Sequence, residues 1–292
     1  MDKYSKTAYF HLPFNFSYLK LYEKVLELYE TKRELFKDNV KIGSFYGSPN
    51  GAIWNGGRMF SGNIIKKQLE EVRDWLYSYN IPFRFTFTNC LIEEKHLNDT
   101  YCNNILDIFN NGKNEVLCNV ELLEKYIRNK YGNGYKYISS TTKRLTDKKE
   151  QQKEIAKDYS LVVLDYDFNK DFDFLKTIKE RNKCEILCNA VCISNCPNRV
   201  KHYENISRCQ LLNDTDDLLE CSETGKRFWQ IQENKNFISN KNIDRYLQMG
   251  FENFKLEGRT AHPLDLVEIF VYYLFKDSKA GIVREILQEV VW

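Results

Sequence analysis

Residues 82–139 read PFRFTFTNCLIEEKHLNDTYCNNILDIFNNGKNEVLCNVELLEKYIRNKYGNGYKYIS and decide the fold. Three short runs rich in aromatic and β-branched residues lie in this stretch, at 82–88, 115–118 and 135–139. Between them, residues 98–109 and 120–130 place apolar side chains at helical spacing. Strands and helices that alternate with short connections require right-handed crossovers, which is typical of a parallel sheet.

The same alternation runs through almost the whole chain. Further strands are expected at 7–12, 41–46, 161–164, 184–188 and 253–256. Further helices are expected at 18–36, 63–79, 146–157, 171–181 and 240–249, with a last long segment from 263 to the C-terminus. Eight such units close a (β/α)8 barrel, so the sequence predicts an α/β protein with a TIM-type barrel that forms one domain, residues 1–292.

Composition limits the classes of function. The chain has 292 residues with 43 Lys+Arg and 41 Asp+Glu, a formal net charge of +2, which argues against nucleic-acid binding by bulk charge. A hydrophobic content of 42% with only 5 prolines and 13 glycines excludes a disordered or fibrous chain. Since no apolar run approaches the ~18 residues that cross a bilayer and no signal peptide is visible, we expect a cytoplasmic protein without a membrane span.

The alternation fails once, between about residues 189 and 240. In a barrel this insertion follows strand seven, at the C-terminal face where such folds place their chemistry. Six of the nine cysteines lie at or beside it: Cys184, Cys188, Cys192, Cys196, Cys209 and Cys221. Cytosolic thiols stay reduced, so this clustering favours metal binding or catalysis over disulfides.

Thiolates are soft ligands that suit an iron–sulfur cluster or zinc. Cys188, Cys192 and Cys196 follow one another at spacings of four, and a further ligand is available in Cys209, Cys221 or His202. The alternative is that Cys184 and Cys188 are buried strand residues and the other cysteines are free thiols, since free cysteine often behaves as a small hydrophobic residue. The spacing alone leaves both interpretations open.

A charged strand end follows the insertion. In a strand, Lys255 and Glu257 share one face, and Arg259 comes directly after them. In a barrel this pair points into the interior near the mouth, where buried charges are paired or serve a site. The residues indicate either a site or a structural ion pair.

The loop after the second expected strand contains several glycines, with Trp54 as a stacking face, Asn55 as a polar contact and Arg58 as an anion ligand. A well-ordered surface loop explains it equally well. Polar residues also follow other strands, and hydrogen bonding at strand ends is their alternative explanation: Asn89, Ser139, Ser140, Thr141, Asp165, Asp167 and Asn189. From these residues we expect Trp54, Asn55, Arg58, Asn89 and Asp165 to bind substrate.

The segment from Phe237 to Arg259, which ends in Lys255-Leu-Glu257-Gly-Arg259, resembles the collagenase-like peptidase family (peptidase family U32). That family has a Ser-x-x-Asp-Leu helix leading through a glycine turn into a Lys-Ile-Glu-Gly-Arg strand end. Phe87-Thr-Asn89, 120–128, Ser139-Ser-Thr141 and Glu185-Ile-Leu-Cys-Asn189 are similar to other family segments in the same order. The resemblance covers about residues 41–275.

The resemblance implies a TIM-barrel-like fold. Some members hold a 4Fe-4S cluster through four cysteines and act in hydroxylation or in tRNA and rRNA modification, whereas others are described as proteases. Carried over by position, Cys192 and Cys196 match the first pair of cluster ligands, and Cys209 and Cys221 match the later pair. Cys188 and His202 are reserve ligands.

Three hypotheses follow. The first is a barrel enzyme that uses an iron–sulfur cluster to modify a small-molecule or RNA-borne substrate, for example by hydroxylation, with a protein partner or electron donor. In it, Lys255, Glu257 and Arg259 orient substrate or relay protons. The second is a zinc-dependent hydrolase or peptidase-like barrel. The third is a non-catalytic ligand-binding barrel.

Overall fold

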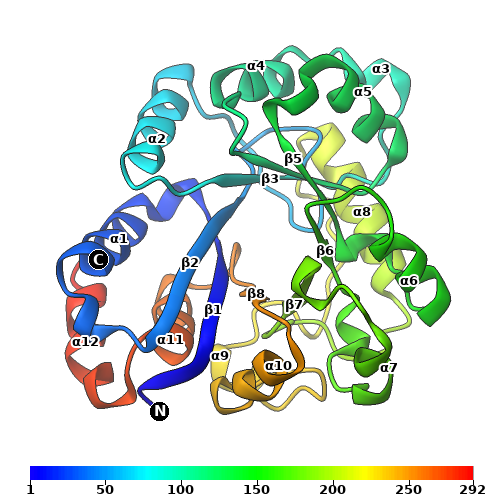
Figure 1. Ribbon diagram of the computed structural model, residues 1–292. Coiled ribbons are helices and arrows are strands. Elements are labelled where there is room, and N and C mark those ends of the chain that lie inside the picture. The colour runs from blue at the N-terminus through cyan, green and yellow to red at the C-terminus, as the bar shows by residue number, and fades with distance from the viewer. Residues whose placement is uncertain (292) are drawn as a thin grey trace. The chain divides into compact units, whose positions relative to one another are not determined.

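A computed structural model describes residues 1–291. Its strands run in chain order around a closed barrel (Figure 1). The eight strands are β1 (Lys3–Pro13), β2 (Asp38–Gly47), β3 (Phe83–Phe87), β4 (Glu115–Cys118), β5 (Lys136–Ser139), β6 (Leu161–Val163), β7 (Cys184–Leu187) and β8 (Asn253–Lys255). Each overlaps one of the eight predicted strands, so the (β/α)8 fold is confirmed.

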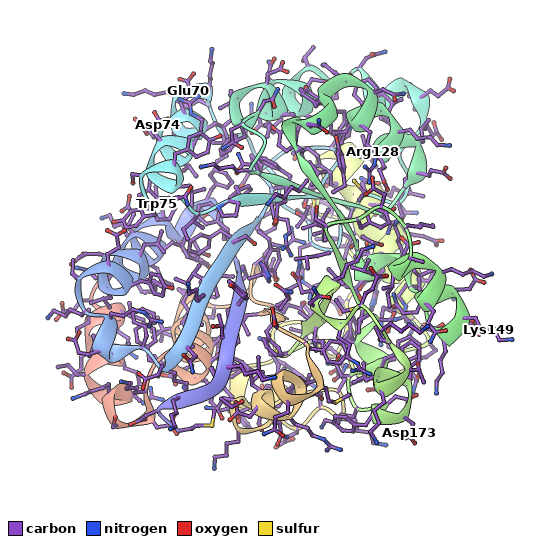
Figure 2. The ribbon with its side chains drawn as sticks, viewed as in Figure 1. Glu70, Asp74, Trp75, Arg128, Lys149 and Asp173 are labelled. Carbon is purple, nitrogen blue, oxygen red and sulfur yellow. The ribbon has the colours of Figure 1, made fainter. Side chains whose placement is uncertain are left out.

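Helices connect the strands. They are α1 (Leu19–Thr31), α2 (Lys66–Ser78), α3 (Glu94–Leu97), α4 (Thr100–Phe109), α5 (Glu121–Tyr131), α6 (Lys148–Ile155), α7 (Phe172–Thr177), α8 (Arg199–Leu212), α9 (Phe228–Ile231), α10 (Ile243–Met249), α11 (Pro263–Leu274) and α12 (Ala280–Gln288). Figure 2 shows charged side chains such as Glu70 and Asp74 on α2 and Lys149 on α6 pointing away from the strands of their own unit. None of the helices described is long and apolar enough to cross a membrane.

The chain divides into two compact units. Unit 1 comprises Met1–Gly43, Tyr166–Ser194 and Ser222–Trp292, and unit 2 comprises Ser44–Asp165 and Asn195–Cys221. Each unit draws on chain segments that are far apart in the sequence. The inserted segment after β7 is therefore shared, since its middle part, with α8, lies in unit 2.

In unit 1, β8 pairs with β1 and with β7, and all three strands are parallel. Phe10 of β1 and Phe254 of β8 have ring centroids 5.7 Å apart, and Phe10 also lies 6.1 Å from Tyr273 of α11. Because successive strand residues alternate in direction, His11 and Lys255, which are paired in register, point to the opposite face. One face of these strands thus packs against an apolar helix, and the other carries charge.

In unit 2, the same alternation operates on β3. Phe83 and Phe85 pack against Phe109 of α4, with centroid separations of 5.9 and 5.1 Å. Arg84 therefore points to the other face, where its Nε donates to Glu115 Oε2 at 2.7 Å in a buried pair. The aromatic face explains why this strand was readily predicted.

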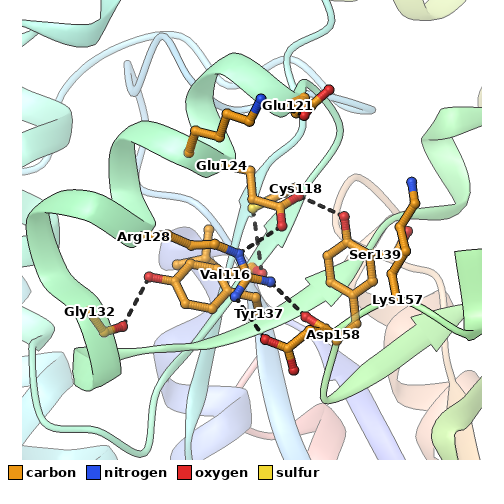
Figure 3. Close-up of polar contacts among 12 residues, drawn as sticks. Val116, Cys118, Glu121, Glu124, Arg128, Gly132, Tyr137, Ser139, Lys157 and Asp158 are labelled. Atoms are coloured by element: carbon orange, nitrogen blue, oxygen red, sulfur yellow. Dashed lines mark hydrogen bonds and ion pairs between the residues drawn. The ribbon is translucent and has the colours of Figure 1, made fainter.

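A polar network fastens helix α5 to unit 2 (Figure 3). Arg128 Nε donates to Glu124 Oε1 at 2.8 Å, and the guanidinium lies 3.9 Å from the centroid of the Tyr137 ring. Tyr159 donates its hydroxyl to Glu124 Oε2 at 2.7 Å. Near it, burial alone would raise the pKa of Glu154, but hydrogen bonds from Lys143, Lys157 and Ser139 lower it to about 2. These charges hold the scaffold.

Three expectations about helices need correction. The segment from residue 263 breaks after α11, because Phe275 is extended and bridges Phe36 before α12 begins. The helix expected at 18–36 ends at Thr31 and is followed by the 3-10 turn Arg33–Leu35. Residues 189–240, in which no helix was predicted, contain α8 and α9. Helix α8 escaped prediction because most of its buried positions are polar, and hydrophobic periodicity does not register them.

Candidate functional site

The end of β6 in unit 2 carries a buried ionic cluster. Asp165 is 1% exposed, and its Oδ2 accepts a hydrogen bond from Arg144 Nη1 at 2.6 Å. Its Oδ1 lies 3.6 Å from Nη1 of Arg199, the first residue of α8. The backbone N–H of Asp165 donates to Gln151 Oε1 at 3.0 Å. Asp165 was predicted as a substrate contact; the structure places it between two guanidinium groups at the C-terminal end of a barrel strand.

Arg144 reaches this cluster from the loop after β5. Its backbone is left-handed, with φ of 57° and ψ of 48°, which is uncommon for a residue other than glycine. This conformation ends the 3-10 turn Thr141–Lys143, and the Arg144 side chain is 15% exposed. A rare backbone conformation that aims a cation at a buried carboxylate is typical of a functional position.

Helix α8 covers the ends of β2 and β3 through hydrogen bonds. Asn55 Nδ2 donates to Gln210 Oε1 at 3.1 Å, and Asn55 Oδ1 accepts from Thr86 Oγ1 at 2.9 Å. Thr86 Oγ1 in turn lies 3.0 Å from Ser48 Oγ. Asn55 was predicted to bind substrate, and in the structure it binds a side chain of α8.

A second contact joins α8 to the end of β3. Asn89 Nδ2 donates to the carbonyl oxygens of Ser207 and Ile53, at 3.0 and 2.9 Å. The N–H of Cys90 donates to Ser207 Oγ at 3.1 Å, and the Cys90 sulfur lies 3.2 Å from the same oxygen. Asn89, another predicted substrate contact, therefore also holds this helix.

Trp54 and Arg58 take scaffold positions. The Trp54 ring is fully buried, packs edge-on against Phe87, and donates from Nε1 to the carbonyl of His96. No face of this ring is left for stacking on a ligand, which corrects the expectation for Trp54. Arg58 is half-buried, and its Nη1 donates to the carbonyl of Gly57 at 2.7 Å.

Unit 1 holds the predicted catalytic Lys255. Its Nζ lies 3.8 Å from Glu185 Oε1, and His11 Nε2 lies 3.4 Å from Glu185 Oε2. All three side chains are buried. A Cβ on Gly43 would come within 2.7 Å of the His11 ring, so glycine at this position makes room for it. Lys255 thus shares a buried carboxylate with His11, which was not among the predicted site residues.

Glu257 and Arg259 lie just beyond Lys255. Asn189 and Glu257 exchange two hydrogen bonds: Asn189 Nδ2 donates to the Glu257 carbonyl at 2.8 Å, and the Glu257 N–H donates to Asn189 Oδ1 at 2.7 Å. Glu257 Oε2 accepts from the N–H of Val191 at 2.9 Å. The Glu257 carboxylate fixes the start of the insertion, and the Arg259 carbonyl accepts from Asn15 Nδ2 at 3.0 Å.

The strand cysteines do not face the insertion. Cys188 is fully buried, and its thiol lies among tyrosines of the helix layer, Tyr246 of α10 and Tyr273 of α11. Burial raises the pKa of Cys188 far above its usual value and that of Cys184 to about 12. The Cys188 thiol thus lies against the helix layer and not beside the insertion, so it is not placed to serve as the reserve ligand that was expected.

The four predicted cluster ligands are less uniform. Cys192, Cys196 and Cys221 are half-buried, whereas Cys209 is buried on α8, and burial raises the pKa of its thiol. His202 is half-buried on the same helix. Within residues 1–291, no group of three or more His, Cys, Asp or Glu side chains is arranged to hold a metal ion. The side chains as placed therefore do not fit a 4Fe-4S or zinc site, and the cofactor stays a prediction.

The fold and these strand-end residues define a (β/α)8 barrel with buried charge at the C-terminal end of a strand. No family model matches the chain. It is 22% identical over 287 residues to a protein of Methanocaldococcus jannaschii that is described as an uncharacterized protease. The matched region covers 94% of this chain and 83% of the relative. The solved structure of the U32 peptidase Mk0906 has the same fold, with a TM-score of 0.53 over 88% of this chain and 95% of that one, at 10% identity. The predicted resemblance to the U32 peptidase family is confirmed.

Sequence reasoning missed several residues of these sites: Arg144, Gln151, Arg199, Ser207 and Gln210 in unit 2, and His11 and Glu185 in unit 1. One signal was available for Glu185, because an acidic residue in a short buried strand must be paired. For Arg199 and Gln210 there was none, since their helix lies in the inserted segment and contacts strand ends more than a hundred residues away in sequence.

Proposed function

We propose that the chain is a peptidase-like barrel that binds an acidic peptide, with a carboxylate of the peptide held by Arg144. The observation that carries this proposal is the buried Asp165 with Arg144 and Arg199 beside it. A guanidinium has five N–H donors and favours bidentate binding of carboxylates, so one group can hold both Asp165 and a second anion. Arg144 is the more accessible of the two arginines.

The names of the similar proteins support a peptide as the substrate, since one is described as a protease and the other as a peptidase. Position in the barrel supports a binding role, because TIM barrels use the C-terminal ends of their strands for this purpose. Asp165 itself accepts a hydrogen bond from Arg144 and lies beside Arg199, so its carboxylate is engaged by the two arginines and is not offered to a substrate. Its role here is to orient the arginines.

The test is binding of a fluorescein-labelled pentaglutamate peptide, followed by anisotropy, with pentaalanine and pentalysine peptides for comparison. Arg144→Gln removes a charge-assisted contact, which is expected to weaken pentaglutamate binding about tenfold to a hundredfold. Added salt weakens the same binding because part of the site is exposed. Equal binding of the three peptides would contradict the proposal.

Arg128→Gln is the matched control. Arg128 also pairs with a carboxylate in unit 2, but with Glu124 in the scaffold network of Figure 3. This variant is expected to lose stability and to keep its affinity for pentaglutamate. Mass spectrometry of the same mixtures then shows whether the peptide is cleaved, which separates a peptidase from a non-catalytic binding barrel.

Redox modification, such as hydroxylation with a cysteine-bound iron–sulfur cluster, is the second candidate. It would require Cys192, Cys196 and Cys221, which are half-buried rather than sealed in the core, to come together from the positions described above. Its test is the visible spectrum and metal content of protein purified without oxygen. Iron absorbance lost in Cys196→Ala would support it, and colourless protein without iron would oppose it.

A further inference from the structure

Helix α8 has an unusual distribution of side chains. Its buried residues are Arg199, Asn205, Ser207, Cys209 and Gln210, of which only Cys209 is apolar. Two of its apolar residues, Val200 and Leu212, are 52% and 64% exposed. Burial of apolar surface, which holds most helices in place, therefore contributes less here than in an ordinary helix, although Ile206 and Leu211 are half-buried. The helix is held by hydrogen bonds, each worth about 1 kcal/mol net, and by the buried pair of Arg199 with Asp165.

The central contact of α8 is made by the Gln210 carboxamide, which is fully buried. Gln210 Oε1 accepts from the N–H of Phe60 at 2.9 Å, and Gln210 Nε2 donates to the carbonyl of the same residue at 3.1 Å. Asn55 Nδ2 donates to the same Oε1 at 3.1 Å. Paired bonds to the N–H and C=O of one residue are what a neighbouring strand makes in an antiparallel sheet. The side chain thus imitates one residue of an extended peptide.

We propose that the backbone of Phe60, with Asn55 beside it, is a binding site for an amide edge of a ligand, and that Gln210 occupies this site while α8 is closed over it. An amide edge means a C=O acceptor next to an N–H donor. It is offered by the main chain of an extended peptide or by a side-chain carboxamide. The proposal extends the peptide-binding function and rests on it for the choice of ligand.

The ends of α8 suit a helix that moves as a unit. Asn195, just before it, and Asn213, at its C-cap, both have a φ of 53°. Both residues flank the helix, where a left-handed asparagine is an ordinary chain terminator, so torsions there can change without unwinding α8. Since the seat of α8 is polar, water replaces its hydrogen bonds on opening with little hydrophobic cost.

A disulfide lock tests the proposal. Because the Cys90 sulfur is 3.2 Å from Ser207 Oγ, Ser207→Cys places two thiols in reach of one another. Oxidised glutathione then links α8 to the end of β3, and dithiothreitol releases it. The probes are N-acetylalanine methylamide, a neutral extended peptide unit, and acetamide, a simple carboxamide. Neither carries a carboxylate, so a failure at Arg144 leaves this test unaffected.

Hydrogen exchange provides the readout. In the reduced variant, the peptide probe is expected to protect the Phe60 amide and to speed exchange across α8, and in the oxidised variant to do neither. Acetamide acting equally well would identify a side-chain carboxamide as the source of the amide edge. The proposal would be overturned if neither probe changed hydrogen exchange in the reduced variant. It would also be overturned if the probes changed exchange equally in the reduced and oxidised variants.

A second variant guards against local misfolding at Ser207. Gln210→Glu removes the donor to the Phe60 carbonyl and is expected to speed exchange of the α8 amides about tenfold, which corresponds to one lost hydrogen bond. Gln152→Glu makes the same change at an exposed position of α6 and should leave α8 unaffected. Unchanged exchange of α8 in Gln210→Glu would count against a seat centred on this side chain.

Discussion

Helices α11 and α8 are similar in length and opposite in construction. Helix α11 buries Leu266, Val267, Ile269, Phe270, Val271, Tyr273 and Leu274, whereas the buried side of α8 consists almost entirely of polar side chains. The first is fixed to unit 1 by apolar surface. The second is attached to unit 2 by hydrogen bonds and one arginine. Under our proposal, a helix around a barrel serves as a permanent wall or as a removable cover according to what it buries.

The largest effect is expected on the buried apolar face of α11, which tests whether this helix is fixed more firmly than α8. Phe270 is fully buried against Tyr22, with ring centroids 6.3 Å apart. Phe270→Ala leaves a cavity and is expected to cost about 3–5 kcal/mol of unfolding free energy, measured by urea denaturation. A loss below about 1 kcal/mol would mean that α11 is not a fixed wall.

The next effect concerns the ionic anchor of α8. Asp165→Asn removes the carboxylate that Arg144 and Arg199 share, and breaking a buried pair costs about 3 kcal/mol. Urea denaturation gives this loss, and exchange of α8 should accelerate with it. Arg128→Gln is the control, because the hydrogen bonds of Arg128 and Glu124 involve no residue of α8. If α8 exchanged at the wild-type rate in Asp165→Asn, the anchor would be wrongly assigned.

A pH effect of intermediate size is expected at the end of α11. Lys37 is fully buried and donates from Nζ to the carbonyls of Tyr272 and Phe275. Burial lowers the pKa of Lys37 to about 8, below the value of about 10.4 in an unfolded chain. Between these values the unfolded state binds more protons, so folding stability gains as pH rises and loses as it falls.

Wild-type stability relative to Lys37→Met should therefore rise by on the order of 2 kcal/mol between neutral pH and pH of about 10. Urea titrations of both proteins at the two pH values measure this difference. Lys276→Met is the surface control, because Lys276 pairs with the exposed Asp38. A difference that stays constant with pH would show that Lys37 keeps an ordinary pKa.

The smallest effect is expected for Gln210→Ala. Loss of its hydrogen bonds should cost only about 1–2 kcal/mol of global stability, because water reaches the vacated groups once α8 lifts. The free energy of local opening of α8, measured by hydrogen exchange, should fall by more than the free energy of global unfolding does. A large loss of global unfolding free energy, with the α8 amides still protected from exchange, would mean that α8 is a fixed part of unit 2, as α11 is of unit 1.

The fold was largely predictable because the strands are short runs rich in aromatic and β-branched residues. Alternating aromatic residues in 82–88 and Gly250, which follows the helix expected at 240–249, are local signals that can be read from a single sequence. The helices α8 and α9 were not predictable in this way. Most of the side chains that seat α8 are polar and find their partners only in three dimensions.

The site divides along the same line. Asp165 was found because strand ends of a barrel converge, and Lys255 because a charge in a buried strand must be accounted for. Asn55 was expected in the loop after the second strand and Asn89 at the end of the third, but nothing in the sequence indicated their partners on α8. Lys255 pairs with Glu185 and not with Glu257. The register between β7 and β8 determines this pairing, and strand register cannot be read from the sequence.

The contacts of α8 also set an order of events in folding. Gln210 meets Asn55 across 155 residues of chain, and Ser207 meets Cys90 across 117. Contacts of such high sequence separation form slowly, because the entropy cost of closing a long loop comes before any stabilisation from the contact. We therefore expect the strands and apolar helices of unit 2 to assemble before α8 docks on them. A newly made chain would pass through a species with an open strand end, and that species is the one most exposed to proteolysis and to binding by chaperones.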